Sequence, residues 1–145
     1  MFLLDTNVVS ELRKVGDGRA DKNVVTWVSS ASTALFYLSV VTLMELEVGV
    51  HRIERRDSKQ GEMLRTWLTQ KVMPTFENQW LPIDEDIAQT CAALQIPDPR
   101  PERDTWIAAT AIVHKMVVVT RNIGDFVPMG VEVINPWDQT PTPST

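Results

Sequence analysis

Four acidic residues stand where predicted strands end or predicted helices begin, at widely separated places in the chain. Asp5 directly follows the apolar run FLL, and Asp125 lies a few residues past the apolar run MVVVT. Glu45 falls near the start of one predicted helix, and Asp104 opens another, WIAATAIV. Because ligand sites in open α/β sheets form outside the carboxyl ends of the strands, we expect these carboxylates to converge there.

Four converging carboxylates predict a particular chemistry. Like charges at close range destabilise a fold unless a cation lies among them. Oxygen ligands without histidine or cysteine suit Mg²⁺ or Mn²⁺, and one or two such ions can polarise a phosphodiester and activate water. We therefore predict that Asp5, Glu45, Asp104 and Asp125 are both catalytic residues and metal ligands.

Each acid also has a purely structural interpretation. Asp5 could cap a helix or form an Asx-turn, and Asp125 could simply make a turn. Thr42 and Glu45 have the spacing of a capping box, and Asp104 could cap its own helix. The metal hypothesis therefore depends on the whole set of acids.

Other acids are expected to lie elsewhere. Glu47 is about 200° round the same predicted helix from Glu45, so it should miss the site. The acidic run at residues 84–86 is explained by a helix N-terminus, where negative charge is favoured.

The elements that position the acids alternate along the chain. The predicted strands are FLL, ALFYLSV, WLPI, MVVVT and VEVI. The predicted helices cover VVSELRK, NVVTWVSSA, about 42–56, about 58–75, DEDIAQTCAALQI and about 104–114, with a loop at IPDPRPER and a turn at NIGDF. This alternation predicts a three-layer α/β/α fold with a central, mostly parallel five-stranded sheet.

The composition limits the class of protein. The chain has 145 residues, 43% hydrophobic and 23% charged, which suits one globular domain over residues 1–138 with a flexible tail at 139–145. Its 14 basic and 19 acidic residues give a net charge of −5. This charge argues against a protein that coats nucleic acid without sequence specificity, because such binding relies on positive charge, but it is compatible with a metal-dependent nuclease. We expect no membrane span and no signal peptide. The single cysteine, Cys91, is expected in the core, and a reducing cytoplasm suits it.

Four motifs in order, LLDTNVVSEL, SVVTLMELEVGV, DTWIAATA and VVTRNIGDF, resemble those of PIN-domain ribonucleases. More narrowly the chain is similar to the VapC toxins of type II toxin–antitoxin systems, and its ending VINPW resembles the FitB branch. The resemblance runs from residue 2 to about residue 138. It implies a PIN-like fold and a Mg²⁺- or Mn²⁺-dependent endoribonuclease that uses the four acids named above.

The resemblance also implies roles for neighbouring polar residues. Asn7, Thr120 and Asn122 match positions that support the acids. Some FitB-like members carry an acid at the position of Asn122 and none at that of Asp125, so either residue could be the fourth at the metal site.

The resemblance further implies partners. These are an RNA substrate and a VapB- or FitA-like antitoxin, whose C-terminal segment blocks the site. The complex is expected to bind promoter DNA only through the antitoxin. A homodimer, or a higher hetero-oligomer with the antitoxin, is expected.

Other residues receive narrower predictions. Arg103 and Arg121 stand beside the proposed acids in sequence and are candidates for RNA phosphate contact. Trp27, Trp67 and Trp106 fall at inward helical positions, as core or dimer-interface residues.

Two other functions compete with the main hypothesis. A phosphohydrolase of the haloacid-dehalogenase type also places an aspartate after its first strand, but it needs a second one two residues later, where this chain has Asn7. A non-catalytic PIN-like binding scaffold usually loses acids, whereas all four are present here.

Overall fold

The central sheet of this computed structural model contains five short strands in the order β3-β2-β1-β4-β5. They are β1 (Phe2–Leu4), β2 (Phe36–Ser39), β3 (Trp80–Leu81), β4 (Val117–Val119) and β5 (Val133–Ile134). All four strand pairs are parallel, and β1 lies in the middle with Phe2 opposite both Phe36 and Val117. The structure describes residues 1–138.

Helices connect the strands. They are α1 (Thr6–Leu12), α2 (Lys22–Ser29), α3 (Val40–Arg56), α4 (Ser58–Trp67), α5 (Met73–Thr75), α6 (Glu85–Leu94), α7 (Glu102–His114) and α8 (Ile123–Phe126). A π-helical segment, Leu68–Val72, joins α4 to α5, and a 3₁₀ turn, Pro136–Asp138, follows β5.

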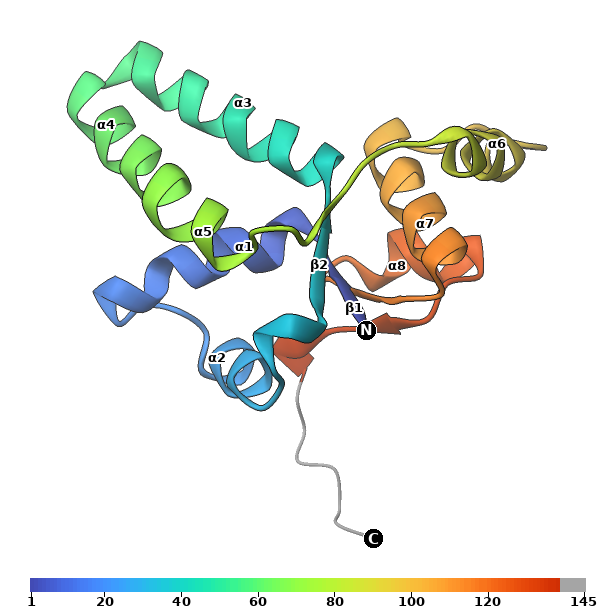
Figure 1. The fold of residues 1–145 in the computed structure, drawn as a ribbon, viewed down its shortest axis with the longest axis horizontal. Coiled ribbons are helices and arrows are strands. Elements are labelled where there is room, and N and C mark those ends of the chain that lie inside the picture. The colour runs from blue at the N-terminus through green and yellow to red at the C-terminus, as the bar shows by residue number, and fades with distance from the viewer. Residues whose placement is uncertain (139–145) are drawn as a thin grey trace, which may run out of the picture.

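The helices form two layers, one on each face of the sheet. In Figure 1, α1 to α5 lie on one side of β1 and β2, and α6 to α8 lie on the other. Successive strand residues point to opposite faces. Leu4 and Val119 accordingly join the core under α1 and α3, whereas Leu3 and Val118 join the core under α7. The predicted three-layer α/β/α fold is confirmed.

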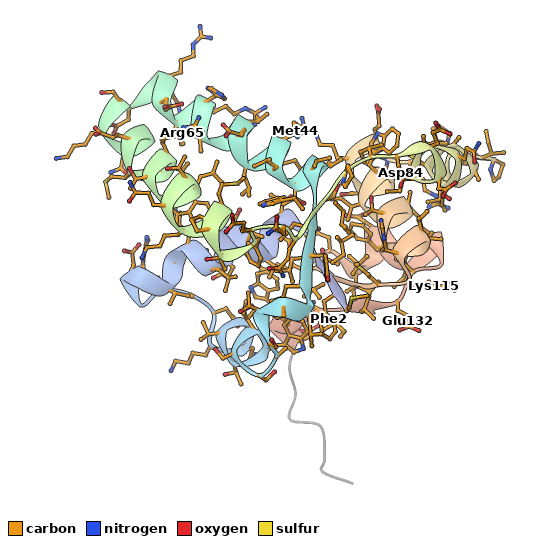
Figure 2. All side chains as sticks on the ribbon, in the orientation of Figure 1. Phe2, Met44, Arg65, Asp84, Lys115 and Glu132 are labelled. Atoms are coloured by element: carbon orange, nitrogen blue, oxygen red, sulfur yellow. The ribbon has the colours of Figure 1, made fainter. Side chains whose placement is uncertain are left out.

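The carboxyl edge of the sheet lies beside the start of α3. Figure 2 shows Phe2, at the amino end of β1, and Met44, on α3, at opposite ends of the sheet. The residues that follow β1, β2 and β4 therefore meet at the Met44 end, which is the edge where the sequence predicts the acids.

Helix α3 begins earlier than predicted. It starts at Val40, and the hydroxyl of Ser39 caps it by accepting from the backbone N–H of Val41 at 3.0 Å. The predicted capping box of Thr42 and Glu45 is therefore wrong. Ser39 and Thr42 are both capping residue types, and Ser39 fills the role because it stands directly at the end of β2.

Three other element predictions need correction. Helix α7 begins at Glu102 rather than Asp104, directly after Pro101, which is its N-cap residue. The predicted turn NIGDF is the short helix α8. The helical spacing within the predicted helix at about 58–75 would turn Met63 inward, yet Met63 is 61% exposed, because α4 lays Gly61 and Leu64 against its neighbours.

The other sequence predictions have mixed outcomes. Cys91 is a buried free cysteine on α6, as predicted. No helix within residues 1–138 is both long enough and apolar enough to cross a membrane. The predicted flexible tail, 139–145, lies outside the described residues.

Candidate active site

Asp5 is fixed at the carboxyl end of β1 by its main chain and by both side-chain oxygens. Its backbone N–H donates to the carbonyl of Val119 at 2.9 Å, which extends the pairing of β1 with β4. Its Oδ1 accepts from the backbone N–H of Thr6 at 2.8 Å, and its Oδ2 accepts from the buried hydroxyl of Thr120 at 2.8 Å. Asp5 therefore does cap α1, as its structural interpretation held, and it also faces a pocket.

The Asp5 carboxylate stands in an unfavourable environment for its charge. The side chain is only 5% exposed, and this burial is the main reason that the pKa of Asp5 rises from 3.8 to about 6. The negative charges of Asp104 and Glu45 raise that pKa further, whereas the hydrogen bonds from Thr120 and Thr6 lower it. These repulsions mean that the three acids are close enough to interact.

Asp104 carries a similar perturbation. Burial raises its pKa, and the charges of Asp125 and Glu45 raise it further. Asp104 lies in the first turn of α7, where the partial positive charge of a helix N-terminus favours an anion. The alternative interpretation of Asp104 as a helix cap does not hold, because Pro101 occupies the N-cap position, without a side-chain hydrogen bond.

Glu45 reaches the site from the second turn of α3. Its Oε1 accepts from the hydroxyl of Thr6 at 2.8 Å, and its Oε2 lies 3.7 Å from the guanidinium of Arg103. The carboxylate thus bridges α3 to both α1 and α7. The hydroxyls of Thr6 and the buried Thr42 also lie within hydrogen-bond distance, 3.2 Å apart, which ties the starts of α1 and α3 together.

Three of the predicted acids line one pocket of about 440 Å³ at this edge of the sheet. They are Asp5, Glu45 and Asp104. The other residues around this acid pocket are Thr6, Asn7, Ser10, Glu11, Lys14, Arg121, Asn122 and Trp137.

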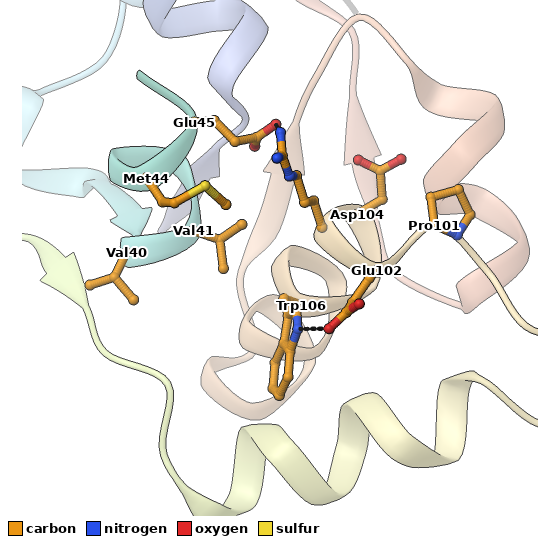
Figure 3. Close-up of a pocket in the computed structure, with 9 residues that line it drawn as sticks. Val40, Val41, Met44, Glu45, Pro101, Glu102, Asp104 and Trp106 are labelled. Atoms are coloured by element: carbon orange, nitrogen blue, oxygen red, sulfur yellow. Dashed lines mark hydrogen bonds and ion pairs between the residues drawn. The ribbon is translucent and has the colours of Figure 1, made fainter. Parts of the chain in front are cut away.

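A larger pocket of about 810 Å³ adjoins the acid pocket, since Glu45 and Asp104 line both. Figure 3 shows these two carboxylates approaching from α3 and α7, above an apolar region that includes Met44 and Trp106. The Trp106 indole N–H donates to Glu102 at 3.4 Å. Trp106, predicted to face inward, is therefore half-buried at the pocket wall.

Asn122 and Asp125 take different positions. Asn122 lines the acid pocket, and its backbone N–H donates to the Thr120 hydroxyl at 3.0 Å. Asp125 is not among the residues that line it, yet its charge contributes to the raised pKa of Asp104. Asn122 therefore supplies a nearby polar group, whereas Asp125 supplies charge at the periphery.

The predicted supporting residues surround Asp5. The Asn7 amide donates to Asp5 Oδ2 and to the Thr120 hydroxyl, both at 3.3 Å. The Asn7 carbonyl oxygen accepts from the backbone N–H of Arg121 at 3.3 Å. Asn7 thus connects the end of β1 to the chain that leaves β4.

The basic residues at the pocket differ in their partners. Arg103 faces Glu45, and Lys14 forms an ion pair with the buried Glu11 at 3.1 Å. Arg121 instead places its guanidinium 5.3 Å from the centre of the Trp137 ring. Both predicted RNA-contact arginines therefore lie at the site, in different environments.

The sequence predictions missed part of the pocket wall. Ser10, Glu11 and Trp137 line it, and none of them was assigned to the site. One helix face carries Asn7, Ser10, Glu11 and Lys14, at spacings of three and four residues. This spacing could have revealed Ser10 and Glu11. Glu47 behaves as predicted: it points away and pairs with Arg65 at 2.7 Å.

The acid pocket has the donor chemistry of a site for a hard cation. All three acids offer carboxylate oxygens, and the raised pKa values of Asp5 and Asp104 mark negative charge that a cation would stabilise. As the side chains stand, however, no three His, Cys, Asp or Glu side chains of residues 1–138 are placed to hold one metal ion together. The residues therefore fit Mg²⁺ or Mn²⁺ in kind, while Glu45 is engaged by Thr6 and Arg103.

This fold and pocket define a PIN domain. The chain belongs to the PIN-domain family, whose model matches residues 2–126. It is 33% identical to the VapC ribonuclease Y4jK of Sinorhizobium fredii, over 95% of this chain and 99% of that protein. It is 35% identical to the toxin FitB of Neisseria gonorrhoeae, over 94% of this chain and 99% of that protein.

A solved structure agrees with these relatives. The structure of FitAB bound to an IR36 DNA fragment superposes on this chain with a TM-score of 0.85 at 34% identity. The match covers 97% of this chain and 98% of that one. The resemblance to VapC- and FitB-like PIN-domain proteins, predicted from four sequence motifs, is thereby confirmed.

Proposed function

We propose that this protein is a metal-dependent endoribonuclease and the toxin of a VapBC-type toxin–antitoxin pair. The observation that carries the proposal is the acid pocket, where Asp5, Glu45 and Asp104 arrive from three separate elements. The pocket belongs to a fold shared with relatives named as a VapC ribonuclease and a FitB toxin.

The metal in this proposal is Mg²⁺ or Mn²⁺. Asp5, Glu45 and Asp104 would hold it, with Asp125 or Asn122 as a fourth participant. When bound, the ion supplies a Lewis acid that activates water and stabilises the departing oxyanion of a phosphodiester.

The protein's own residues prepare this chemistry. The hydrogen bonds from Thr120 and Thr6 lower the pKa of Asp5 and so favour the carboxylate, against the opposing effect of burial. With a pKa of about 6, Asp5 is mostly ionised at pH 7.5 and able to act as a ligand. Thr6 orients Glu45, while Arg103 supplies positive charge on the side of the larger pocket.

The remaining partners follow from the same proposal. The solved structure of FitAB bound to DNA supports a FitA- or VapB-like antitoxin that blocks the site and contacts promoter DNA on behalf of both proteins. We propose a homodimer, or a hetero-oligomer with the antitoxin, in the cytoplasm where the RNA substrate is found. Residues 1–138 form the catalytic domain in this view.

The alternatives fit the site less well. Asn7 occupies the position where a haloacid-dehalogenase-type phosphohydrolase needs its second aspartate, and its amide donates to Asp5 instead of supplying a second acid. A non-catalytic scaffold does not account for the convergence of Asp5, Glu45 and Asp104 on one pocket, where burial and the charges of the other two raise the pKa of Asp5.

RNA cleavage by the purified protein tests the proposal. We expect cleavage of a mixed RNA sample with Mn²⁺ or Mg²⁺, loss of cleavage with EDTA, and a reduction of at least about 100-fold in Asp5→Asn. Glu47→Gln is the matched control, since it removes a carboxylate from the same helix as Glu45 but outside the pocket. If Asp5→Asn cleaves RNA as well as the parent at equal Mn²⁺, the metal-nuclease proposal is wrong.

The toxin assignment needs a separate test in cells. We expect overproduction of the chain alone to arrest growth, and co-production of the cognate antitoxin to restore it. Unimpaired growth, with soluble and RNA-cleaving protein present, would contradict the toxin role but leave the nuclease activity standing.

A further inference from the structure

The guanidinium of Arg121 lies over the ring of Trp137 on the wall of the acid pocket, and these two residues are called the stacked pair below. The guanidinium carbon of Arg121 lies 5.3 Å from the centre of the Trp137 ring, within the range of a cation–π interaction. Both residues line the pocket that contains Asp5, Glu45 and Asp104. None of the roles assigned above uses this stacking.

The chain fixes Trp137 from three directions. Its backbone N–H donates to the side-chain oxygen of Asn135 at 2.9 Å, and its carbonyl accepts from the amide of Asn23 on α2 at 2.9 Å. Its ring packs against the core that includes Leu4 and Val119. The 3₁₀ turn after β5 therefore presents a rigid aromatic surface to the pocket.

Arg121 is held at its backbone but open at its side chain. Its N–H donates to Asn7, which in turn donates to Asp5. The residue is exposed, and within residues 1–138 its guanidinium lies in no ion pair. Arg103, by contrast, has Glu45 within 3.7 Å.

Stacking suits a guanidinium that must bind a phosphate. The aromatic ring engages the flat face of the group, while its N–H donors lie in the plane and remain free. A planar fork of donors matches two oxygens of one phosphate, which a lysine cannot reproduce. A fixed cation here would also offset the repulsion between the pocket carboxylates and an incoming RNA backbone.

We propose that Trp137 is a positioning residue for Arg121, and that Arg121 binds a phosphate of the RNA strand beside the acid pocket. This inference rests on the proposed ribonuclease function. It assigns the stacked pair to substrate binding, with the acids reserved for metal and chemistry.

Binding of RNA under non-cleaving conditions tests the pair. The probe is a labelled single-stranded RNA of about 20 nucleotides, titrated with Asp5→Asn protein in EDTA over a range of salt concentrations. Arg121→Ala in this background should weaken binding and make the log–log salt dependence shallower by about 0.7, the value for one phosphate contact to a single strand. Arg121→Lys should keep the salt dependence but bind about two- to five-fold more weakly.

A double-mutant cycle identifies the role of Trp137. Trp137→Leu should weaken binding about two- to five-fold, the range of an exposed cation–π interaction, and Trp137→Phe should retain most of the affinity. In the Arg121→Ala background, Trp137→Leu should have no further effect, because Trp137 acts through Arg121. Arg56→Ala, an exposed cation at the far end of α3, is the charge-matched control and should bind like its parent.

The outcomes separate the two proposals. An equal loss from Trp137→Leu with and without Arg121 would overturn the positioning role, as would an unchanged salt dependence in Arg121→Ala. Because Arg121 is exposed, its two variants carry the test even if Trp137→Leu does not fold. If the parent cleaves and binds RNA but neither residue matters, only the stacked-pair inference is wrong. If the parent neither binds nor cleaves RNA, the proposed function fails and the inference fails with it.

Discussion

We expect Asp5→Asn to make the fold more stable at neutral pH, although it removes the acid at the centre of the pocket. Asp5 is buried, and its pKa rises from 3.8 to about 6 on folding. A raised carboxyl pKa means that the native state favours the protonated form. The contribution of Asp5 to the free energy of unfolding is therefore fully present below about pH 3.8 and is lost as the pH rises through about 6.

The magnitude follows from the same values. At about 1.4 kcal/mol per pH unit, the rise to about 6 corresponds to roughly 3 kcal/mol of lost stability at neutral pH. Asparagine removes this cost but cannot reproduce every hydrogen bond that Thr6, Asn7 and Thr120 donate to the carboxylate, a loss of about 1–2 kcal/mol. The variant should thus be about 1–2 kcal/mol more stable than its parent at pH 8 and less stable at pH 4.

Urea denaturation in EDTA, followed by tryptophan fluorescence between pH 4 and pH 8, measures this difference. Glu47→Gln is the control, since it removes a partly exposed carboxylate paired with Arg65 and should change stability by less than about 1 kcal/mol. Added Mn²⁺ should stabilise the parent, by about 2.7 kcal/mol at 100 times the Kd, but not Asp5→Asn. A difference between Asp5→Asn and its parent that stays constant from pH 4 to pH 8 would refute the reasoning.

Three further predictions concern the site and its scaffold. The rate of RNA cleavage should fall as the pH is lowered through about 6, because Asp5 becomes protonated there; a flat pH–rate profile from 5 to 8 would contradict this. Thr120→Val removes a hydrogen bond that lowers the pKa of Asp5, so that profile should shift to higher pH and urea denaturation should show a loss of about 1–3 kcal/mol. Gly61→Ala should destabilise the fold by about 1–3 kcal/mol, because the added Cβ would lie 2.5 Å from the Cα of Glu54. Gly49→Ala is the control: a Cβ there would meet no atom within 4 Å, so the variant should be neutral or stabilising by up to about 1 kcal/mol. Equal thermal unfolding temperatures for the two alanine variants would show that α3 and α4 do not pack closely at Gly61.

The sequence predicts the architecture because its apolar runs are well separated. FLL and MVVVT became the adjacent central strands β1 and β4, and Asp5 was placed correctly from this pattern alone. The start of α3 was less predictable, since Ser39 and Thr42 are both capping residues and only the end of β2 decides between them. Helix α7 likewise starts two residues before the predicted position, at Glu102, directly after Pro101.

The finer geometry of the site depends on contacts between distant segments. Sequence proximity to Asp104 suggested a phosphate contact for Arg103, yet in the fold its neighbour is Glu45, from 58 positions earlier in the chain. The contact between Arg121 and Trp137 joins the chain after β4 to the end of the described residues, and no local sequence pattern predicts this contact. Side-chain partners of this kind are fixed by tertiary packing, which periodicity and residue type do not encode.

The position of β1 in the middle of the sheet bears on how the protein is made. Thr120, which donates to the Asp5 carboxylate, follows Asp5 by 115 positions in the chain. At about 5–20 residues per second, the ribosome adds Thr120 on the order of ten seconds after Asp5. Every stalled or truncated product that ends before β4 lacks one of the two strands that flank β1, as well as the wall that closes the pocket. The pocket is therefore completed only after β4 and the residues that follow it have been synthesised, which delays any activity there until both sides of the pocket exist.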